Sequence, residues 1–321
     1  MTVLLEAVAA AGDRLVEASR GKIDFDVPRA LSRSEDLSLG KPGLWSPNRN
    51  SRLIACRDGW IAVSLARDDD RDLVPAWTGA SFDTHPWDAV IAAAARRSAE
   101  EMAAAAIALH LPVAVVGETR HLPQAQLSLG GGGGNKVIDL SALWAGPYCA
   151  GLLAEAGFDV VKIESPARPD PTARHTPALD ARINGAKRRV TMALENPRLM
   201  SAVSRARVLV TSARPHALAH LGLDEATVFA RNPGLLWIAV TAHGWRGPAA
   251  MRVGFGDDCA AAGGLVEWRG AEPSFMGDAL ADPLTGMTAA ILALEALAED
   301  RCGLLDVPLA GSAARFAEAI A

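Results

Sequence analysis

The sequence lacks paired cysteines and any metal-binding spacing of cysteine and histidine. Its 321 residues contain four isolated cysteines, Cys56, Cys149, Cys259 and Cys302, with no C-x-x-C motif and no histidine nearby at ligand spacing. Disulfide frameworks and zinc sites both need such closely grouped residues. We therefore expect neither a disulfide framework nor a metal site.

The sequence also lacks a strong charge of either sign. Its 32 basic and 37 acidic side chains give a net charge of -5. Proteins that bind nucleic acid usually carry a pronounced basic surface. No nucleic-acid partner is expected.

Apolar runs long enough to cross a bilayer are missing, although half of the residues are apolar. A span needs roughly 20 consecutive apolar residues, and His110 and Pro112 interrupt the alanine-rich stretch 103–116. The N-terminal segment 1–21 has acidic residues and no basic start of a secretory signal. We expect an amphipathic N-terminal helix, no membrane contact and a cytoplasmic protein.

A run of five glycines, residues 130–134, divides the chain. Such a run favours a linker, because glycine loses much conformational freedom inside a helix or strand. A phosphate-binding loop is the alternative, but no Lys-Ser/Thr follows and a strand comes next. We predict an N-terminal helix and small α+β domain over 1–129, a linker over 130–135 and a large domain over 136–321.

The large domain alternates apolar strand patterns with amphipathic helical patterns. Strands are predicted at 137–140, 160–164, 208–211 and 235–240, with a helix over 146–156. This alternation predicts an α/β fold with a doubly wound, mostly parallel, Rossmann-like sheet. The first turn lacks G-x-G-x-x-G, so no nicotinamide dinucleotide is expected.

The region before the glycine run has a different pattern. Residues 52–66 predict a hairpin that turns at Asp58-Gly59, and the alanine-rich residues 87–109 predict helix. These features indicate the smaller α+β domain.

Six segments occur in the order typical of one enzyme family. They are VIDLSALWAGPYCAGLLAEAGFDVVKIESP (137–166), RPDPTAR (168–174), NGAKRRVTMAL (184–194), RPHALAHLGL (214–223), ALADPLTGMTAAILALEAL (279–297) and LLDVPLA (304–310). Together they resemble family III CoA-transferases of the CaiB/BaiF type, a family that also contains α-methylacyl-CoA racemases. The small domain of that family normally follows the large one, so the chain resembles a circularly permuted member.

The resemblance places the family's catalytic aspartate at Asp282. Asp282 precedes Pro283 and a run of apolar residues at helical spacing, which predicts an N-cap position and an ionised carboxylate near the positive end of the helix dipole. In the family this carboxylate forms an anhydride and then a thioester with CoA. A plain helix cap is the structural alternative, and Asp278 is a rival nucleophile.

The resemblance also indicates residues that contact CoA. The turn formed by Trp144, Ala145, Gly146 and Pro147 is expected beside CoA. Two glycines near the thioester could stabilise an oxyanion through their N–H groups, or could simply form a turn. Two cations are weaker candidates for the phosphates. These four residues are Gly263, Gly264, Lys187 and Arg214.

Several positions depart from the family pattern. Basic positions that hold CoA phosphates in some members fall on Ser165, Glu195, His220 and Val253, and a glutamine is replaced by Trp144. These changes leave open a non-catalytic acyl-CoA-binding protein or partner subunit.

The racemase branch needs a histidine and an aspartate as a proton-transfer pair. The histidine position holds Phe255, and His243 is the nearest substitute along the chain. The function predicted first is transfer of CoA between carboxylic acids, and an acyl-CoA racemase or epimerase is the alternative. A homodimer is expected; family members form interlocked homodimers, and the permuted order leaves interlocking open here.

Overall fold

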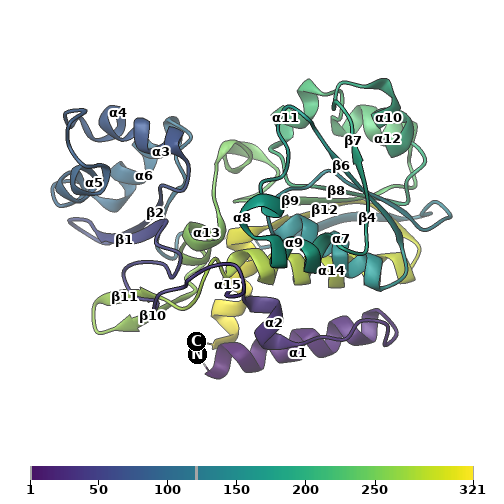
Figure 1. Ribbon diagram of the computed structural model, residues 1–321, viewed down its shortest axis with the longest axis horizontal. Helices are drawn as coiled ribbons and strands as arrows, with labels where there is room; N and C mark the ends of the chain where they lie inside the picture. The colour runs from purple at the N-terminus through teal and green to yellow at the C-terminus, as the bar shows by residue number, and fades with distance from the viewer. Residues whose placement is uncertain (1, 120–121, 321) are drawn as a thin grey trace.

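The computed structural model describes residues 2–119 and 122–320, which form a large and a small lobe. Figure 1 shows the small lobe on the left and the large lobe on the right. Helix α13 (Gly256–Ala262) lies between them, and the hairpin of β10 (Val266–Arg269) and β11 (Glu272–Phe275) lies below the small lobe in this view.

The large lobe is built on a seven-stranded sheet with the order β4-β12-β9-β8-β5-β6-β7. Neighbouring strands from β12 to β7 are parallel, and the edge strand β4 pairs antiparallel with β12. This arrangement confirms the predicted doubly wound, mostly parallel sheet. In chain order the strands are β4 (Gln124–Leu129), β5 (Lys136–Asp139), β6 (Asp159–Glu164), β7 (Arg188–Thr191), β8 (Val208–Thr211), β9 (Leu236–Thr241) and β12 (Arg301–Pro308).

Helices cover both faces of this sheet, because successive strand residues point to opposite sides. Val137 of β5 packs into the core under α7 and α14, whereas Ile138 packs into the core beside α10 and α12. The helices are α1 (Thr2–Ala18), α2 (Val27–Leu31), α7 (Ala145–Glu155), α8 (Thr172–His175), α9 (Pro177–Asn184), α10 (Pro197–Val203), α11 (Pro215–His220), α12 (Glu225–Arg231), the 3₁₀ helix η1 (Gly247–Met251), α14 (Ala281–Ala298) and α15 (Leu309–Ile320).

Helix α14 is the central helix of the lower layer. It packs against α7, α1, α15 and β12. Among the described helices it is the one long and apolar enough to cross a bilayer, but 67% of it is buried inside the fold. Burial within the protein accounts for its apolar composition, as expected for a core helix.

The small lobe is a three-stranded antiparallel sheet covered by helices on one side. Its first two strands meet at Asp58-Gly59, which confirms the predicted hairpin. Ser98 and Glu101 form a capping box, so the predicted helical region is two helices and not one. The elements are β1 (Ser51–Ala55), β2 (Trp60–Ser64), β3 (Val113–Val115), α3 (Asp68–Asp72), α4 (Val74–Thr78), α5 (Pro86–Ala94) and α6 (Ala99–Ala108).

The boundary between the lobes differs from the predicted one. Strand β4, which precedes the glycines, belongs to the large sheet, and α1 packs against α14 and α15. The glycine run therefore joins two strands of one sheet. Its backbone is also packed, since Gly131 N donates to Asp300 O (2.9 Å) and Gly132 N donates to Gly234 O (3.0 Å).

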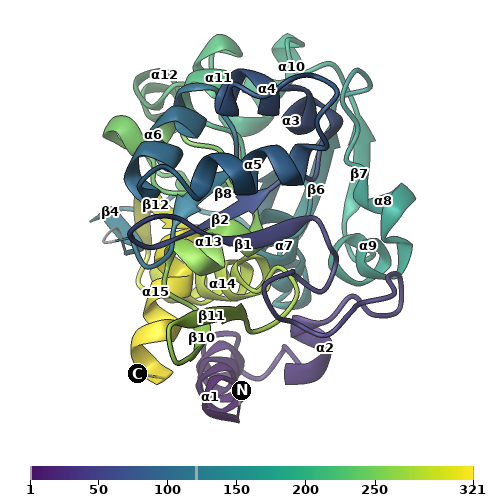
Figure 2. The ribbon, with the colours of Figure 1, turned by 90° about the vertical axis from the view of Figure 1, so that its left-hand side faces the viewer.

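The two lobes meet at α13, which packs against β2 and β3 of the small lobe. Ala261 of α13 shares an apolar cluster with Leu53, Ala62 and Phe275. Figure 2 shows α13 between the small sheet and α14. Residues at the start of α13 therefore lie where both lobes can contribute side chains.

Candidate active site

Asp282 lies in the first turn of α14, where that helix meets α13. Helix α14 begins at Ala281, and Leu280 is its N-cap. The predicted N-cap position of Asp282 is wrong, because the chain is already helical at Leu280. Oδ2 of Asp282 lies so close to Gly256 that any side chain at that glycine would collide with it. The carboxylate thus faces the start of α13.

Three further aspartates surround Asp282. Asp257 and Asp258 come from α13, and Asp278 precedes α14. All three are buried, with exposed fractions of 5% or less. Arg33, from the segment after α2, is the cation whose charge acts on Asp282, and Arg67 of the small lobe acts on Asp258. With four carboxylates and two nearby guanidinium groups, the acidic groups outnumber the basic ones.

Asp278 is the best paired of these carboxylates. Arg33 donates to it through Nε (2.6 Å to Oδ2) and Nη2 (3.1 Å to Oδ1). Asn48 Nδ2 donates to Asp278 Oδ1 (2.5 Å) and to Asp257 Oδ2 (3.0 Å), so one amide links two aspartates. A bidentate guanidinium pair of this kind is strong and fixes its geometry. The predicted rival nucleophile is therefore held in an ion pair.

Asp257 and Asp258 accept hydrogen bonds from the small lobe. Ser51 Oγ donates to Asp257 Oδ2 (3.0 Å), and Ser64 Oγ donates to Asp258 Oδ1 (2.8 Å). Asp257 Oδ1 also accepts from the N–H of Ala279 (2.7 Å), a non-glycine residue with a φ of 47°. Backbone conformations of this kind cost energy and are often found at functional sites.

The Asp282 carboxylate accepts no hydrogen bond from the described residues. Burial raises its pKa from 3.8 to about 7, the Arg33 charge opposes that rise, and the other aspartates add to it. Burial likewise raises the pKa of Asp258 to about 7. The sequence predicted an ionised carboxylate, but desolvation outweighs the helix dipole, and Asp282 exchanges its proton near neutral pH.

Two buried polar atoms near the starts of α7 and α14 have no hydrogen-bond partner within the described residues. They are Nε1 of Trp144 and Oγ1 of Thr285, which is one turn after Asp282 on α14. The Arg33 guanidinium lies 5.2 Å from the centroid of the Trp144 ring. Because buried polar groups are normally satisfied, these atoms are available to a ligand.

The predicted A-G-P turn forms the first turn of α7, directly after β5. No side chain of the described residues caps this helix, so the N–H groups of Ala145 and Gly146 are not consumed by such a cap. A Cβ at Gly146 would lie 2.6 Å from Ser141 Oγ. Gly146 is therefore required for packing between α7 and the loop after β5. The turn lies at the switch point of the sheet, where open α/β sheets bind ligands.

Lys187 is not placed to hold a phosphate. Its ammonium is buried and donates to Asp139 Oδ2 (2.8 Å), Pro147 O (2.7 Å) and Asn184 Oδ1 (2.8 Å). An ammonium has three N–H donors, and all are used. The expectation for Lys187 is thus wrong, because its charge is neutralised inside the fold. Although burial acts in the other direction, Lys187 and Lys162 hold the pKa of Asp139 below its usual value.

Gly263 and Gly264 form the turn at the end of α13. Their N–H groups donate to Cys259 O (3.0 Å) and Ala261 O (2.9 Å). Neither amide is free for an oxyanion, and Gly264 has a φ of 81° that favours glycine. The alternative of a tight turn is the one found.

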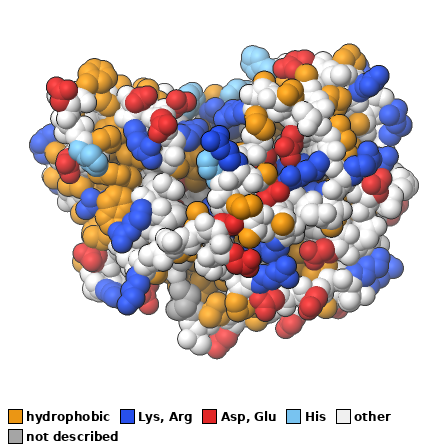
Figure 3. All heavy atoms as spheres, in the orientation of Figure 1, with side chains coloured by type: hydrophobic (Ala, Val, Ile, Leu, Met, Phe, Trp, Pro, Cys, Tyr) orange, Lys and Arg blue, Asp and Glu red, His pale blue; other side chains and the backbone are white. Residues whose placement is uncertain are grey.

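Arg214 belongs to a group of basic side chains from both lobes. It contacts His110 Nδ1 of the small lobe (3.3 Å) and Met251 O (3.1 Å). Burial lowers the pKa of Arg214, and Arg67 and Arg168 lower it further. Figure 3 shows Lys, Arg and His side chains gathered at the hollow between the lobes. We call Arg67, Arg168, Arg214, His110 and His216 the basic cleft.

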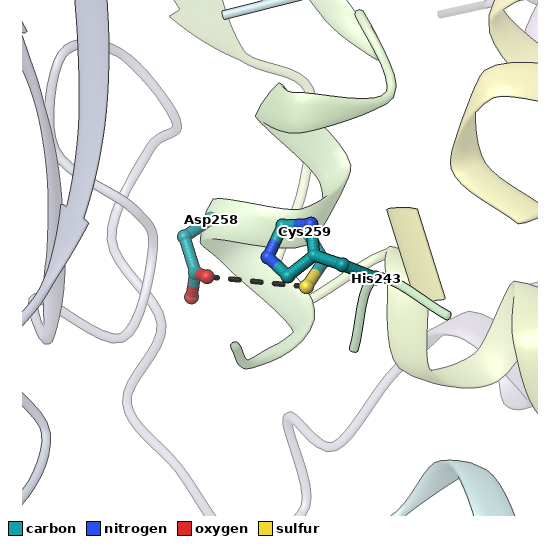
Figure 4. A group of neighbouring side chains, drawn as sticks. All are labelled: His243, Asp258 and Cys259. Carbon is teal, nitrogen blue, oxygen red and sulfur yellow. Dashed lines mark hydrogen bonds between the residues drawn. The ribbon is translucent and has the colours of Figure 1, made fainter. Parts of the chain in front are cut away.

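His243, Asp258 and Cys259 have ligand atoms that lie within 4.8 Å of one another (Figure 4). All three side chains are buried. Burial raises the pKa of the Cys259 thiol well above its usual value, and the thiol lies 3.6 Å from the acceptor Ala242 O. A protonated thiol is a poor metal ligand. We therefore interpret His243 and Cys259 as side chains that pack against Asp258, and not as metal ligands.

The profile of CoA-transferase family III matches residues 133–320, more than half of the chain. The chain belongs to this family. The match covers the large sheet from the glycine run onwards, and it includes α13 and α14. The circular order of the two lobes relative to other members stays a prediction.

Curated relatives include CoA-transferases named for carboxylic acids. Succinyl-CoA--D-citramalate CoA-transferase of Chloroflexus aurantiacus is 33% identical over 50% of this chain and 44% of its own length. The alpha subunit of succinyl-CoA--L-malate CoA-transferase from the same organism is 33% identical over 62% of this chain and 50% of its own length. The chain thus spans about half the length of these relatives.

A solved CAIB/BAIF family protein from Brucella suis has a similar fold. Its TM-score is 0.51 at 27% identity, over 57% of this chain and 54% of that chain. The protein Rv3272 from Mycobacterium tuberculosis gives a TM-score of 0.51 at 26% identity. Both likenesses support the Rossmann-like fold.

Sequence reasoning missed the side chains that complete the carboxylate cluster. Arg33, Asn48 and Ser51 come from segments 200 or more residues away from Asp278 and Asp257 along the chain. The adjacent pair Asp257-Asp258 was a visible signal, since acidic residues seldom stand together in an apolar segment. Their partners could not be inferred from local patterns.

Proposed function

We propose that this protein transfers CoA between carboxylic acids and that Asp282 is its nucleophile. The observation that carries this proposal is that, of the four clustered aspartates, Asp282 is the one whose carboxylate is neither ion-paired nor hydrogen-bonded within the described residues. The Arg33 ion pair occupies Asp278, and hydrogen bonds occupy Asp257 and Asp258, whereas the Asp282 carboxylate accepts none within the described residues. The relatives' names supply the chemical class, transfer of CoA from succinyl-CoA to another carboxylic acid.

The reaction needs no net proton transfer. An ionised Asp282 oxygen attacks the acyl carbon of the thioester, the C–S bond breaks, and CoA leaves as a thiolate beside a mixed anhydride. The thiolate then attacks the aspartyl carbon, and the donor acid departs as a carboxylate. The acceptor carboxylate attacks the resulting aspartyl-CoA thioester, and the same steps run in reverse. Only the deprotonated form of Asp282 starts this sequence.

The pKa of Asp282 therefore predicts a pH dependence. With a pKa raised to about 7 by burial, the carboxylate is protonated at pH 5 and ionised at pH 9. Below pH 7 the rate should fall about tenfold per pH unit, and above it the rate should level off. A pH profile of kcat/KM with saturating acceptor would measure this decrease on the acid side, the acid limb of the profile.

We further propose that CoA lies across the basic cleft towards the uncapped start of α7. The guanidinium groups of Arg168 and Arg214 suit phosphate groups, which bind guanidinium strongly, whereas Arg67 is already paired with Asp70. The Trp144–Pro147 turn leads from that cleft to α14, since Ala145 O contacts Gly286 one turn beyond Asp282. The thioester would then reach Trp144 Nε1 and Thr285 Oγ1, the two unsatisfied polar atoms.

Mass spectrometry of the quenched protein tests the nucleophile. The protein is incubated with a panel of acyl-CoAs and dicarboxylic or monocarboxylic acids, and peptides are searched for an acyl or CoA adduct on Asp282. Hydroxylamine should inactivate the protein only when an acyl-CoA is present. An adduct on Asp278 would move the nucleophile, and failure to bind any CoA ester would leave the non-catalytic alternative.

A racemase or epimerase is the second candidate, on one specific observation. A buried imidazole, His243, lies beside Asp258 in the same cluster, although the family's histidine position holds Phe255. A racemase exchanges the α-proton of its substrate with solvent, and a transferase does not. Deuterium uptake into a 2-methylacyl-CoA in heavy water, without CoA transfer, would favour this candidate.

We also propose a homodimer. A groove of about 450 Å³ runs beside α1, β10 and α15, and it is lined mainly by apolar side chains, among them Val3, Val266, Trp268 and Met276. Trp268 is 52% exposed, and large exposed apolar groups often mark an interface. Light scattering at micromolar concentration should give twice the chain mass of 33.5 kDa. A monomer would contradict the proposal.

A further inference from the structure

The segment between α2 and the small lobe carries Arg33, whose side chain lies at the carboxylate cluster around Asp282. Arg182 Nη2 donates to Ser32 O (2.7 Å) on one side of Arg33. On the other side, the Asp36 carboxylate accepts from Ala178 N (2.8 Å). The backbone around Arg33 is thus fixed to α9 of the large lobe on both sides.

Arg33 itself is held between a carboxylate and an aromatic ring. Its guanidinium forms the bidentate pair with Asp278, and it lies 5.2 Å from the centroid of the Trp144 ring. The two side chains of the ion pair are 20% and 4% exposed. Such burial leaves the Arg33 charge weakly screened, so it acts on nearby groups.

The groups that act on the Asp282 charge come from three elements. The segment after α2 supplies one cation, and α13 and the loop before α14 supply acidic groups. These groups are Arg33, Asp257, Asp258, Cys259 and Asp278. Arg33 favours the ionised form of Asp282, and the three aspartates oppose it. Asp278 also holds the Arg33 guanidinium in place. This one ion pair therefore contains a charge that favours the ionised form of Asp282 and a charge that opposes it.

We propose that Arg33, fixed by Asp278, is a positioning residue that sets the pH at which Asp282 becomes a nucleophile. This inference rests on the transferase function proposed above. Arg33 forms no bond with the substrate in this mechanism. The charge of Arg33 allows the Asp282 carboxylate to ionise near neutral pH, whereas burial and the surrounding acidic groups alone would keep it protonated there.

The two halves of the ion pair should shift the acid limb of kcat/KM in opposite directions. Arg33→Gln removes the cation, so the limb should move to higher pH by about one unit or more. Asp278→Asn keeps an acceptor for Arg33 but removes a negative charge, so the limb should move to lower pH. Arg33→Lys keeps the charge and should stay near the wild-type limb. Thermal melts check that each variant is folded.

A structural ion pair would give a different pattern. Both substitutions would then lower the rate while the acid limb stayed in place, and that result would overturn the inference. Carbon-13 NMR of labelled aspartate, with the Asp282 signal assigned by its loss in Asp282→Asn, follows the same titration without turnover. A shifted Asp282 titration without any adduct on Asp282 would refute the proposed function. An adduct with unshifted limbs in both variants would refute only the role of Arg33.

Discussion

Two buried charge clusters in this protein have opposite compositions. Under the A-G-P turn, Lys187 pairs with Asp139 (2.8 Å) and Lys162 with Asp170 (3.0 Å), so charges balance. Around Asp282, the Arg33 guanidinium faces three other carboxylates. The pKa of Asp139 is lowered by its lysines, although burial opposes this, whereas burial raises that of Asp282.

If Asp282 acts as proposed, this contrast distinguishes aspartates that stabilise the fold from an aspartate that takes part in the reaction. A balanced buried pair holds its members in one charge state, and its rupture leaves an uncompensated charge. An unbalanced cluster keeps at least one carboxylate close to the point of exchanging its proton. We therefore expect substitutions in the first cluster to change stability and those in the second to change turnover.

The largest expected effect is on turnover in Asp282→Asn. Removing the nucleophile should lower kcat by at least about 10³-fold, since no anhydride can form. Steady-state assays with the best acyl-CoA and acid pair would measure this loss. Turnover within tenfold of wild type would remove Asp282 from the mechanism.

The same substitution should leave the fold intact and make it more stable at high pH. Because the folded-state pKa of Asp282 is raised from 3.8 to about 7, wild-type stability falls as pH rises through that window. The Asn variant lacks this penalty, so its advantage should grow between pH 4 and pH 7 to at most about 4 kcal/mol. Urea titrations at pH 4 and pH 8 would measure it. An equal difference at both values would contradict the pKa assignment.

Lys187→Met should destabilise the protein by about 3–5 kcal/mol, because Asp139 is left buried without its cation. Urea unfolding measures the effect. Lys136→Met is the matched control, since Lys136 pairs with Asp159 at 3.9 Å on the surface and should contribute less than about 1 kcal/mol. If Lys187→Met instead weakened CoA binding at unchanged stability, the originally predicted phosphate contact would be restored.

Gly146→Ala should cost about 1–3 kcal/mol through overpacking against Ser141. Gly133→Ala provides a comparison, because a Cβ there meets no atom within 4 Å. The double variant Gly146→Ala/Ser141→Gly should recover part of the loss, as expected for a direct steric contact. Additive losses would locate the constraint elsewhere.

The smallest effect is expected at the edge of the basic cleft. Arg214→Ala should weaken CoA binding about five- to tenfold, because the side chain is partly exposed and solvent screens its charge. Arg205→Ala serves as the control, since Arg205 precedes β8 at the opposite end of the strands. Calorimetry at two salt concentrations would compare them. Equal affinities would remove Arg214 from the CoA site.

Local patterns in the sequence predicted the sheet well. The apolar runs that became β5, β6, β8 and β9 are short and lie between amphipathic stretches, so period and length identify them. The pairing of β4 with β12 could not be inferred, because Gln124–Leu129 is largely exposed at a sheet edge and has no buried pattern. The domain boundary was misplaced for this reason.

The site was predicted in part. Family resemblance indicated Asp282 as a candidate, but the direction in which its pKa shifts depends on groups brought together only by the fold. Lys187 looked like a free cation because its acidic partner, Asp139, is 48 residues away in sequence. A single lysine carries no sequence signal that distinguishes a buried ion pair from a phosphate contact. Burial decides between them.

Oxygen exchange into Asp282 is the most direct test of the mechanism. When an acceptor acid labelled with ¹⁸O in its carboxylate attacks aspartyl-CoA, one labelled oxygen bridges the anhydride and stays on Asp282 after thiolate attacks the acyl carbon. Peptide mass spectrometry should therefore find the Asp282 peptide heavier by about 2 Da after one turnover. Label on Asp278 or Asp257, or CoA transfer without any label in the protein, would contradict a nucleophilic Asp282.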